Sequence, residues 1–506
     1  MPNDPEVAPP PDQLPHSSSS GHANLQPALE EKLIDWDGLD DPSNPFNWPQ
    51  LKKWRVTLLA CFMTFVVEIN GTAMTSAAEQ INDSFHISDE EFPHSYWPVL
   101  SWNLGGAAAP LLGLPLMEGF GVRWSYLIIY ATMIIMIIPQ ALAQNFATLI
   151  ITRIITGGCS GILANITSGI VSDIWREGRA KSFSTSLYIW GLLAGLSMGP
   201  VIGSAIVQYT SWRWIFLSQI IFYTTLLPPL YLLLPEVRPD VLLAQRAHHL
   251  HLATRQPTIP AAPSPPPPNL RTILRETLLR PTRMLATEAV VLSFGLWSAF
   301  CIGTAFTFTQ SLPQVYTTLY AWTFYNTGLI QSAIVVGETL GLLASLYNDT
   351  LYFASASRNL ETPHSPIPEA RLYLSIPASF LGLSGGLFWF AWTSSPALHW
   401  LVPSTALLFV GFGMFCATTA VTTYILDSYA RYAASAIAGI AFLENVFAAL
   451  MPLAAQSMYR ALGLRWAGSL LGFVALALSC VPLVLWRFGA RIRARSPFMG
   501  VAGYGK

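Results

Sequence analysis

Long apolar blocks dominate the chain from residue 55 onward, and short polar segments separate them. Most blocks hold about 18–25 residues with seldom more than one ionisable side chain, the length that crosses a hydrocarbon core of about 30 Å. The pattern predicts an all-α polytopic membrane protein with twelve transmembrane helices. We expect these helices at about residues 55–78, 95–117, 124–143, 147–172, 182–207, 213–234, 284–309, 322–346, 371–393, 398–426, 432–459 and 465–487.

The polar segments divide the predicted helices into two sets of six. Between the sets lies a proline-rich run at 263–268, which forms a stiff, exposed linker rather than a helix. Residues 1–50 are rich in Pro, Ser, Asp and Glu and hold no apolar core of a signal peptide. The predicted organisation is a disordered cytosolic tail (1–53), a six-helix bundle (54–234), a cytosolic linker with the proline-rich run and an amphipathic helix (235–283), a second six-helix bundle (284–488) and a cytosolic tail (489–506).

The distribution of basic residues predicts the orientation. With a cytosolic N-terminus, the cytosolic segments hold 23 of the 27 Lys and Arg residues, and the first external loop is acidic with no basic residue. The positive-inside rule expects this asymmetry when both termini are cytosolic. In this topology the sequon Asn82-Asp83-Ser84 faces outside, so Asn82 is the candidate for N-glycosylation.

Composition argues against several function classes. Only 11% of the residues are charged, whereas soluble proteins have about a quarter; the net charge of −1 gives no indication of a nucleic-acid partner. The five cysteines fall in apolar runs without metal-ligand spacing, and no helix interior contains a His, so we expect no metal site and no cofactor. No segment resembles a nucleotide-binding loop. The chain is expected not to be an enzyme and not to be driven directly by a nucleotide.

One face of the fifth predicted helix consists of glycine. Gly191, Gly195, Gly199 and Gly203 recur every four residues and form a line along which another backbone can approach closely. Pro200 lies beside this line, removes a backbone donor and predicts a bend. We interpret the helix as a bent interface helix on which the two halves of the protein rock; the alternative is helix packing alone. Small residues form similar lines in the second, eighth and eleventh helices, and this spacing suggests a repeated three-helix unit.

Ionisable residues inside the predicted helices are candidates for proton coupling, because such residues are costly in lipid and are functional by default. They are Glu68, Arg153, Glu338 and Glu444. Glu68 and Arg153 both lie toward the outer side of the first half, so a pairing is geometrically plausible. Glu68 is the first candidate for the titrating carboxylate and Arg153 for its modulator. The alternatives are a static buried ion pair, or a glutamate that faces the lipid headgroups.

Polar side chains inside the helices predict the lining of a substrate cavity. A single threonine carries little information, because its hydroxyl can bond to its own helix backbone. Three embedded glutamates against one arginine favour neutral lipophilic or cationic substrates over anionic ones. The candidate lining residues are Asn70, Asn165, Thr307, Gln310, Thr419 and Tyr424.

Several motifs together resemble those of the drug:proton antiporters of the major facilitator superfamily. Gly-Pro-Val-Ile-Gly at 199–203 resembles the antiporter motif of their fifth helix. Arg-Ile-Ile-Thr-Gly-Gly at 153–158 resembles their fourth-helix motif, whose arginine is implicated in proton coupling. The segments 35–49, 368–372 and 428–436 are similar to signatures of the fungal twelve-span members. The likeness covers about residues 35–497.

The cytosolic loops match that family only in part. The loop after the second helix usually ends in Gly-Arg-Arg or Gly-Arg-Lys; here it keeps Glu118, Gly121 and Arg123. The loop after the fourth helix keeps Asp173 and Arg179. Because the first loop is thought to latch the two halves in the family, the resemblance implies a weakened latch. Glu444 stands in a stretch where relatives often carry Arg, which implies altered coupling or substrate charge.

The resemblance implies two pseudo-symmetric six-helix bundles around a central cavity that opens alternately to the two sides of the membrane. It implies a proton-coupled efflux pump for a drug-like or secondary-metabolite compound at a fungal plasma membrane, with an internal membrane such as that of the vacuole or peroxisome as the alternative. Its partners would be a small molecule, protons and the lipid bilayer, without nucleic acid or nucleotide, and the fold can work as a monomer. A proton-driven importer or polyamine or nutrient carrier of the same fold, and a non-transporting nutrient sensor, stay open.

Overall fold

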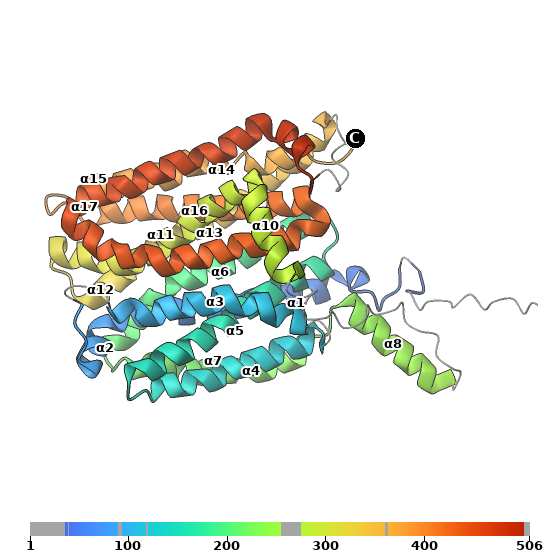
Figure 1. Ribbon diagram of the computed structural model, residues 1–506, viewed down its shortest axis with the longest axis horizontal. Coiled ribbons are helices and arrows are strands. Elements are labelled where there is room, and N and C mark those ends of the chain that lie inside the picture. Colours follow the sequence, from blue (N-terminus) through green and yellow to red (C-terminus); the bar gives the residue numbers. More distant parts are fainter. Residues whose placement is uncertain are drawn as a thin grey trace, which may run out of the picture.

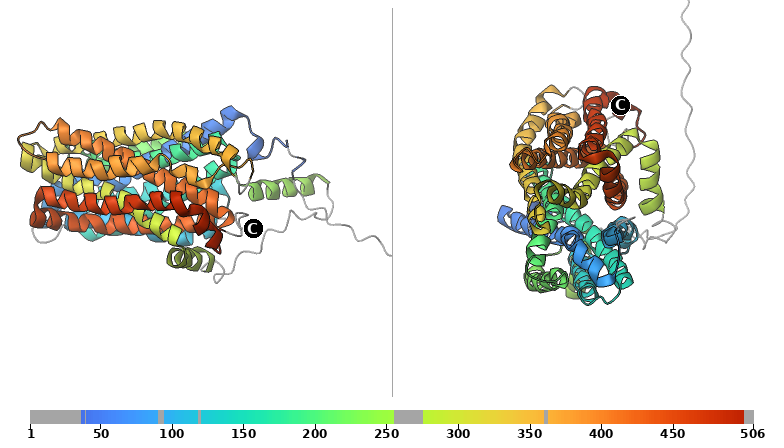
Figure 2. Two further views of the ribbon diagram at one scale, coloured as in Figure 1. Left: turned by 90° about the horizontal axis from the view of Figure 1, so that it is seen from above. Right: turned by 90° about the vertical axis from the view of Figure 1, so that its left-hand side faces the viewer.

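The protein is a pair of helical bundles that lie side by side. The computed structural model describes residues 36–38, 40–89, 94–117, 120–254, 275–359 and 363–499. The long helices run nearly parallel to one common axis, with the N-terminal set in blue to green and the C-terminal set in yellow to red (Figure 1). Viewed along that axis, the two sets form separate bundles that share one long contact (Figure 2). The expected disordered tail falls mostly outside the described residues.

The N-terminal bundle contains the six helices that the apolar blocks predict. They keep the predicted order, and their ends fall within about five residues of the predicted ones. Beyond α1 the chain continues through a 3-10 turn (Ala73–Ala77) into the short α2 (Ala78–Phe85). The six helices are α1 (Gln50–Thr72), α3 (Trp97–Met117), α4 (Val122–Ala141), α5 (Phe146–Ile174), α6 (Arg179–Val207) and α7 (Arg213–Leu233).

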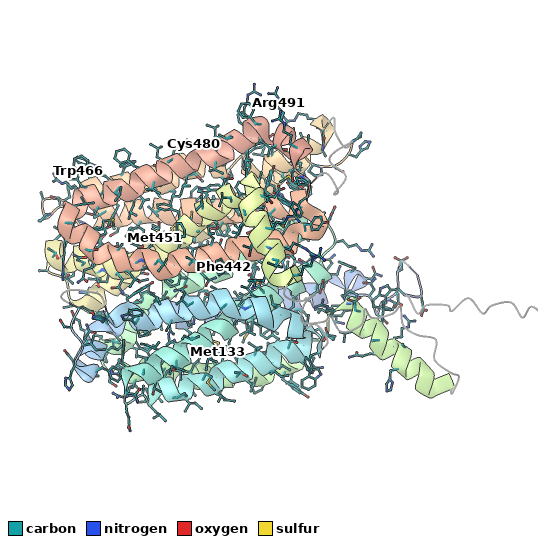
Figure 3. The ribbon with its side chains drawn as sticks, in the orientation of Figure 1. Met133, Phe442, Met451, Trp466, Cys480 and Arg491 are labelled. Atoms are coloured by element: carbon teal, nitrogen blue, oxygen red, sulfur yellow. The ribbon has the colours of Figure 1, made fainter. Side chains whose placement is uncertain are left out.

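The C-terminal bundle repeats this arrangement with one unusually long element. Helix α17 (Ala433–Arg495) holds two predicted spans, and it turns back on itself at Gly463, whose φ of 74° is readily adopted by glycine. Phe442 and Met451 lie on its first limb, while Trp466, Cys480 and Arg491 lie on the second (Figure 3). The other spans are α11 (Ala289–Tyr320), α13 (Ser332–Ala354), the stretch Pro368–Thr393 that ends in α15 (Gly385–Thr393), and α16 (Leu401–Tyr429). The short α12 (Phe324–Leu329) precedes α13.

The number of spans agrees with the predicted twelve. Ten helical stretches of the described residues are long and apolar enough to cross a membrane. One of these is α17, which counts twice because of its break at Gly463. Helix α3, with 21 residues and no Asp, Glu, Lys or Arg, supplies the remaining span.

The connection between the bundles contains helices at one end of the molecule, which we call the α8 end; the opposite end carries α2 and α12 (Figure 1). Sequence reasoning missed α8 (Pro239–Thr254), because its residues show no apolar face. The predicted amphipathic helix is represented by a π-helical turn (Arg275–Leu279) and α10 (Arg280–Thr287). The proline-rich run at 263–268 lies outside the described residues.

The segment that precedes α1 binds α8 through Asp41. The guanidinium of Arg246 on α8 lies 2.6 Å from Asp41 Oδ2, and the backbone N–H groups of Ser43 and Asp37 donate to the same carboxylate at 2.8 and 3.0 Å. Those N–H groups, together with Arg246, hold the pKa of Asp41 well below its usual range. The carboxylate therefore stays ionised through neutral pH, and the attachment weakens only in strong acid.

The glycine line of α6 packs against α1, within the N-terminal bundle. A Cβ atom added at Gly195 would lie 2.4 Å from the carbonyl oxygen of Phe65, and one added at Gly203 would lie 2.0 Å from that of Ala73. Cβ atoms added at Gly191 and Gly199 would lie 2.8 Å from the carbonyl oxygen of Cys61 and 2.0 Å from Thr72 Oγ1, both on α1. The backbones of the two helices thus touch along about three turns. The glycine line thus packs within one bundle, as the helix-packing alternative expects, while the role of the whole helix as an interface stays a prediction.

Pro200 leaves a free carbonyl that α1 satisfies. Because proline has no N–H, the carbonyl of Leu196, four residues earlier, lacks its helical donor. Thr72 Oγ1 donates to that oxygen at 2.7 Å, and Ser76 Oγ donates to the carbonyl of Pro200 at 2.8 Å. The bend-forming residue is therefore tied to the end of α1 by two hydroxyl groups.

The small-residue lines of α3 and α13 likewise serve packing inside a bundle, whereas Ala434 and Ala438 of the eleventh predicted helix line the cavity described below. A Cβ atom added at Gly105 of α3 would lie 2.0 Å from the carbonyl oxygen of Ile154 on α5. One added at Gly337 of α13 would lie 1.9 Å from that of Leu408 on α16. The recurrence every third helix thus corresponds to pairs of helices, α1 with α6, α3 with α5 and α13 with α16, that must approach closely.

Replacing Gly203 with alanine is expected to destabilise the protein, because the added methyl group collides with the Ala73 carbonyl. Overpacking of this kind costs about 1–3 kcal/mol. The matched control is Gly169→Ala on α5, where an added Cβ meets nothing within 4 Å; there the better helix propensity of alanine should leave stability unchanged or slightly higher. Thermal unfolding of the purified variants in detergent measures both. Equal melting temperatures for the two variants would contradict the assigned packing.

Candidate functional site

A cavity of about 390 Å³ lies between the two bundles. Helices α1, α3, α5 and α6 line it from one side and α10, α11, α16 and α17 from the other. It extends toward the α8 end as far as Arg280 and Pro281 of α10. Its polar lining consists of Glu68, Asn103, Ser160, Asn165, Ser168, Tyr188, Arg280, Thr418, Thr422, Ser435, Glu444 and Asn445, among apolar and aromatic side chains.

Contacts between the bundles close the cavity toward the α2 end. The hydroxyl of Tyr96, before α3, donates to the carbonyl of Ala448 on α17 at 2.9 Å. The ring of Trp102 on α3 lies 6.5 Å from that of Phe306 on α11. Trp102 and Phe306 both line the cavity. A molecule bound in the cavity would therefore meet an aromatic wall on this side.

Two of the predicted glutamates face this cavity. Glu68 of α1 accepts a hydrogen bond from Ser160 Oγ of α5 at 2.9 Å, and Glu444 of α17 accepts one from Ser298 of α11. Tyr188 of α6 lies within electrostatic range of both carboxylates. The structure thus brings together two carboxyl groups that are 376 positions apart in the sequence, one from each bundle. The cavity lining thus holds one carboxyl group from each bundle.

Arg153 does not pair with Glu68, contrary to the pairing that we considered plausible. Its guanidinium, fully buried, donates to three backbone carbonyls: Asn70 at 2.7 Å, Gly71 at 2.6 Å and Pro98 at 3.1 Å. Asn70 and Gly71 lie where α1 gives way to the 3-10 turn, so their carbonyls are helix-end groups that need donors. A cation at a helix C-terminus is also favoured by the helix dipole. Arg153 therefore ties α5 to α1 and α3.

Glu338 lies outside the cavity, at the contact between the bundles. It is fully buried on α13, and Ser197 Oγ of α6 donates to its Oε1 at 2.9 Å. The sequence-predicted group of proton-coupling candidates is thus divided by the structure. Glu68 and Glu444 face the cavity, Arg153 joins helices within one bundle, and Glu338 joins the two bundles.

Of the six predicted lining residues, Asn165 alone lines the central cavity. Asn70 instead donates to Gln219 at 2.7 Å, and Thr307 donates to the carbonyl of Gly303 at 2.7 Å. Thr419 belongs to a much smaller cavity near the α8 end. Gln310 and Tyr424 do not line the central cavity; the ring of Tyr424 packs against Phe294 of α11.

Sequence reasoning missed several lining residues that carry the same signal as Asn165. Asn103 of α3 and Asn445 of α17 are amides inside apolar runs, so the criterion that selected Asn165 would also have selected them. A Cβ atom added at Gly106 would lie 2.8 Å from Asn445 Oδ1, which shows how closely the two bundles meet here. Ser160 and Tyr188 gave no such signal.

A polar network joins the bundles at the α8 end. Arg371, before α15, donates to Asp427 at 2.8 Å, to Asp349 at 3.2 Å and to Ser182 Oγ at 2.6 Å. Ser182, in the first turn of α6, donates to Asp349 at 2.5 Å. One serine of the N-terminal bundle is therefore held by an ion-pair cluster of the C-terminal bundle. Sequence reasoning placed Arg371 in a signature segment but assigned it no partner.

The predicted loop motif contacts its own bundle at two of its residues. Gly121 has a φ of 81°, and Arg123 donates to the carbonyl of Tyr231, at the end of α7, at 3.0 Å. Glu118 lies outside the described residues. Asp173 stands at the end of α5, while Arg179 reaches the other bundle, with its guanidinium 5.9 Å from the ring of Phe353.

Glu236, which follows α7, anchors this loop. Its carboxylate accepts the backbone N–H groups of Val122 and Arg123 at 3.0 and 3.1 Å, which begin α4. A carboxylate at a helix N-terminus satisfies groups that have no partner inside the helix. At the opposite end, the amide of the glycosylation candidate Asn82 donates to Asp89 at 2.7 Å.

The absence of an ion pair between Arg153 and Glu68 predicts independent effects of their substitution. Arg153→Lys should destabilise the protein, because a single ammonium group cannot reproduce the fork that reaches three carbonyls. Glu68→Gln keeps an acceptor for Ser160 and should change stability little. We expect the unfolding free energies of the two single variants to add in the double variant within about 0.5 kcal/mol. A larger coupling energy, measured by a double-mutant cycle in mixed micelles, would contradict this prediction and indicate that Arg153 and Glu68 do form an ion pair.

Comparison with known proteins identifies the family. The sequence profile of the Major Facilitator Superfamily matches residues 60–452. An MFS-type transporter of Macrophomina phaseolina is 31% identical over 471 residues, which cover 92% of this chain and 90% of that protein. A citrinin biosynthesis cluster MFS transporter of Monascus ruber is 31% identical over 480 residues, covering 93% of each. An efflux pump of Floropilus chiversii is 29% identical over 487 residues, covering 94% of this chain and 88% of that protein.

Solved structures share the fold. The proton:xylose symporter XylE aligns with a TM-score of 0.62 at 16% identity, over 87% of this chain and 96% of that chain. The human organic anion transporter MFSD10 aligns with a TM-score of 0.58 at 15% identity, over 86% of this chain and all of that chain. With the profile match and the two-bundle architecture, the conclusion is direct: this chain belongs to the major facilitator superfamily of membrane transporters.

Proposed function

We propose that this chain is a proton-coupled exporter that moves a drug-like or secondary-metabolite molecule out of the cytoplasm by alternating access. The observation that carries the proposal is the cavity between the bundles with Glu68 in its lining. The names of several similar fungal proteins, an efflux pump and transporters of biosynthesis clusters among them, support export of a metabolite. The mainly apolar lining with a few polar groups suits a lipophilic molecule.

Glu68 is our choice for the residue that couples transport to protons. Its carboxylate faces the cavity and has Ser160 as a hydroxyl partner, with no salt bridge to a basic residue within the described part of the chain. Such a group changes its charge when solvent access or a bound cation changes. Proton binding to Glu68 and substrate binding in the cavity would then compete, which is the requirement for exchange. Glu444 would add to the preference for neutral or cationic molecules.

We further propose that both termini face the cytosol, so that the α8 end is cytosolic. The excess of basic residues in the segments at that end supports this orientation. The cavity, closed toward the α2 end by Tyr96 and extended toward Arg280, would then receive substrate from the cytosol. The plasma membrane is the proposed site of action, with the protein working as a monomer in the bilayer.

Energised transport in inside-out vesicles tests the proposal. Vesicles from cells that express the chain should accumulate a labelled lipophilic or cationic compound from a panel, and an uncoupler should abolish the accumulation. Glu68→Gln should reduce it to the uncoupled level, because the coupling carboxylate is gone. The control is Glu79→Gln, which neutralises an exposed glutamate of α2 and should leave transport unchanged.

Other outcomes would point elsewhere. Accumulation that ignores the uncoupler would overturn the proton coupling but not the fold. Proton-driven uptake into intact cells would support the importer instead. If no compound is moved in either direction although the protein folds normally, the result would favour the nutrient-sensor hypothesis over transport.

A further inference from the structure

The contact between α6 and α13 is a row of polar interactions that joins the two bundles. Ser182 meets Asp349 near the α8 end at 2.5 Å, and Trp190 Nε1 donates to Thr339 Oγ1 at 3.1 Å farther along. Ser197 then donates to Glu338 at 2.9 Å. Glu338 is thus part of the surface on which one bundle must move relative to the other.

Glu338 differs from every other member of this row, because it is an acid without a basic partner. The side chain is fully buried, and its Oε2 atom has no hydrogen-bond partner among the described residues. No salt bridge of the described residues involves it. An ionised carboxylate in such surroundings is strongly disfavoured, since neither water nor a cation compensates its charge. A neutral carboxyl fits, with either oxygen able to bond to the Ser197 hydroxyl.

Charged groups on the neighbouring elements are too distant to compensate Glu338. Asp349 is eleven positions farther along α13, about 16 Å by helical rise. The elements that pack on α13 are α6, α16, and the 3-10 turns Ser355–Arg358 and Pro368–Leu372. Their charged residues gather at the α8 end, and the tyrosines and Cys416 are neutral at physiological pH. The ionisable groups on these elements are Arg179, Lys181, Tyr188, Arg358, Glu369, Arg371, Cys416, Tyr424, Asp427 and Tyr429.

From this geometry we propose that Glu338 is a proton-dependent catch between the two bundles, separate from the substrate cavity. While α6 and α13 are packed together, Glu338 holds a proton and bonds to Ser197. When the helices part at this level, water enters, the proton passes to water, and the ionised carboxylate opposes re-packing. The catch rests on the proposed function only in that a proton gradient drives the cycle; it is a positioning element and does not touch the substrate.

The row itself supplies a matched control. Thr339 is the neighbour of Glu338, it makes a hydrogen bond of similar length across the same contact, and it carries no titratable proton. Thr339→Val removes one interfacial bond without changing any charge. Glu338→Gln keeps the size and the polar group of the side chain but removes the proton equilibrium. Comparing the two separates proton dependence from loss of contact.

Spin labels at the α2 end measure the separation of the bundles without substrate. Tyr209, after α6, and Leu398, before α16, are exposed positions on opposite bundles and can be replaced by labelled cysteines. Cys480→Ser removes the exposed native cysteine; the other four are buried. Pulsed electron–electron double resonance on protein in nanodiscs then gives the ratio of separated to packed conformers. The pH is varied between about 5 and about 9, a range chosen to bracket the titration of a perturbed carboxyl.

In the unmodified background, one linked proton changes this ratio by up to about tenfold per pH unit. We expect Glu338→Gln to abolish the pH dependence and Thr339→Val to retain its slope while moving the ratio uniformly. Ser197→Ala, which removes a hydrogen bond of the packed, protonated state, should keep the slope but shift the midpoint to lower pH, and it covers the case in which Glu338→Gln does not fold. A pH slope that survives in Glu338→Gln would overturn the catch, as would no pH dependence in the parent. Because no substrate is present, these outcomes do not depend on whether Glu68 couples transport.

Discussion

The structure depends on one constraint: hydrocarbon offers no hydrogen-bond partner, so every polar group inside the membrane must find one within the protein. Helices satisfy the backbone, but bends and helix ends release carbonyls that side chains must reach. Thr72 bonds to the carbonyl that Pro200 leaves free, and Arg153 bonds to those at the end of α1. Such contacts require helices to approach closely, and the glycine lines make that approach possible. In each bundle, the hydrogen bonding of buried polar groups therefore depends on close packing of the helices.

The amount of the fold that the sequence predicts follows from this constraint. Apolar blocks of membrane-spanning length can only be helices, so the twelve spans and the two sets of six follow from hydropathy. The break of α17 also follows, because Gly463 stands near a charged turn. Helix α8 was missed because its residues show no apolar periodicity. A tertiary contact, that of Arg246 with Asp41, holds the helix instead. Long-range contacts of this kind have no local signature.

The candidate site shows the same limit more sharply. The period of four in Gly191–Gly203 identifies a face that must touch a backbone, but it does not say which backbone. Likewise, the presence of Glu68 and Arg153 toward the outer side of the first half makes a pairing conceivable, whereas the actual partner depends on side-chain direction. Two free carbonyls at the end of α1 and that of Pro98 on α3 together hold three N–H groups of Arg153, which one carboxylate cannot match without its own desolvation cost. The residue types predict which groups require a hydrogen-bond or charge partner, and the geometry of the fold decides which partner each group finds.

The two faces of α6 use different chemistry for different tasks. Toward α1, its glycines give backbone contacts that have no alternative partner, so the two helices can only move together. Toward α13, Ser182, Trp190 and Ser197 give hydrogen bonds that water can replace when the contact opens. A transporter that rocks one bundle against the other needs both properties in one helix: rigidity on the face within its bundle and exchangeable bonds on the face between bundles. In the proposed alternating-access cycle, the glycine motif of α6 would serve movement indirectly, by joining α1 and α6 into one rigid unit whose opposite face can separate from α13.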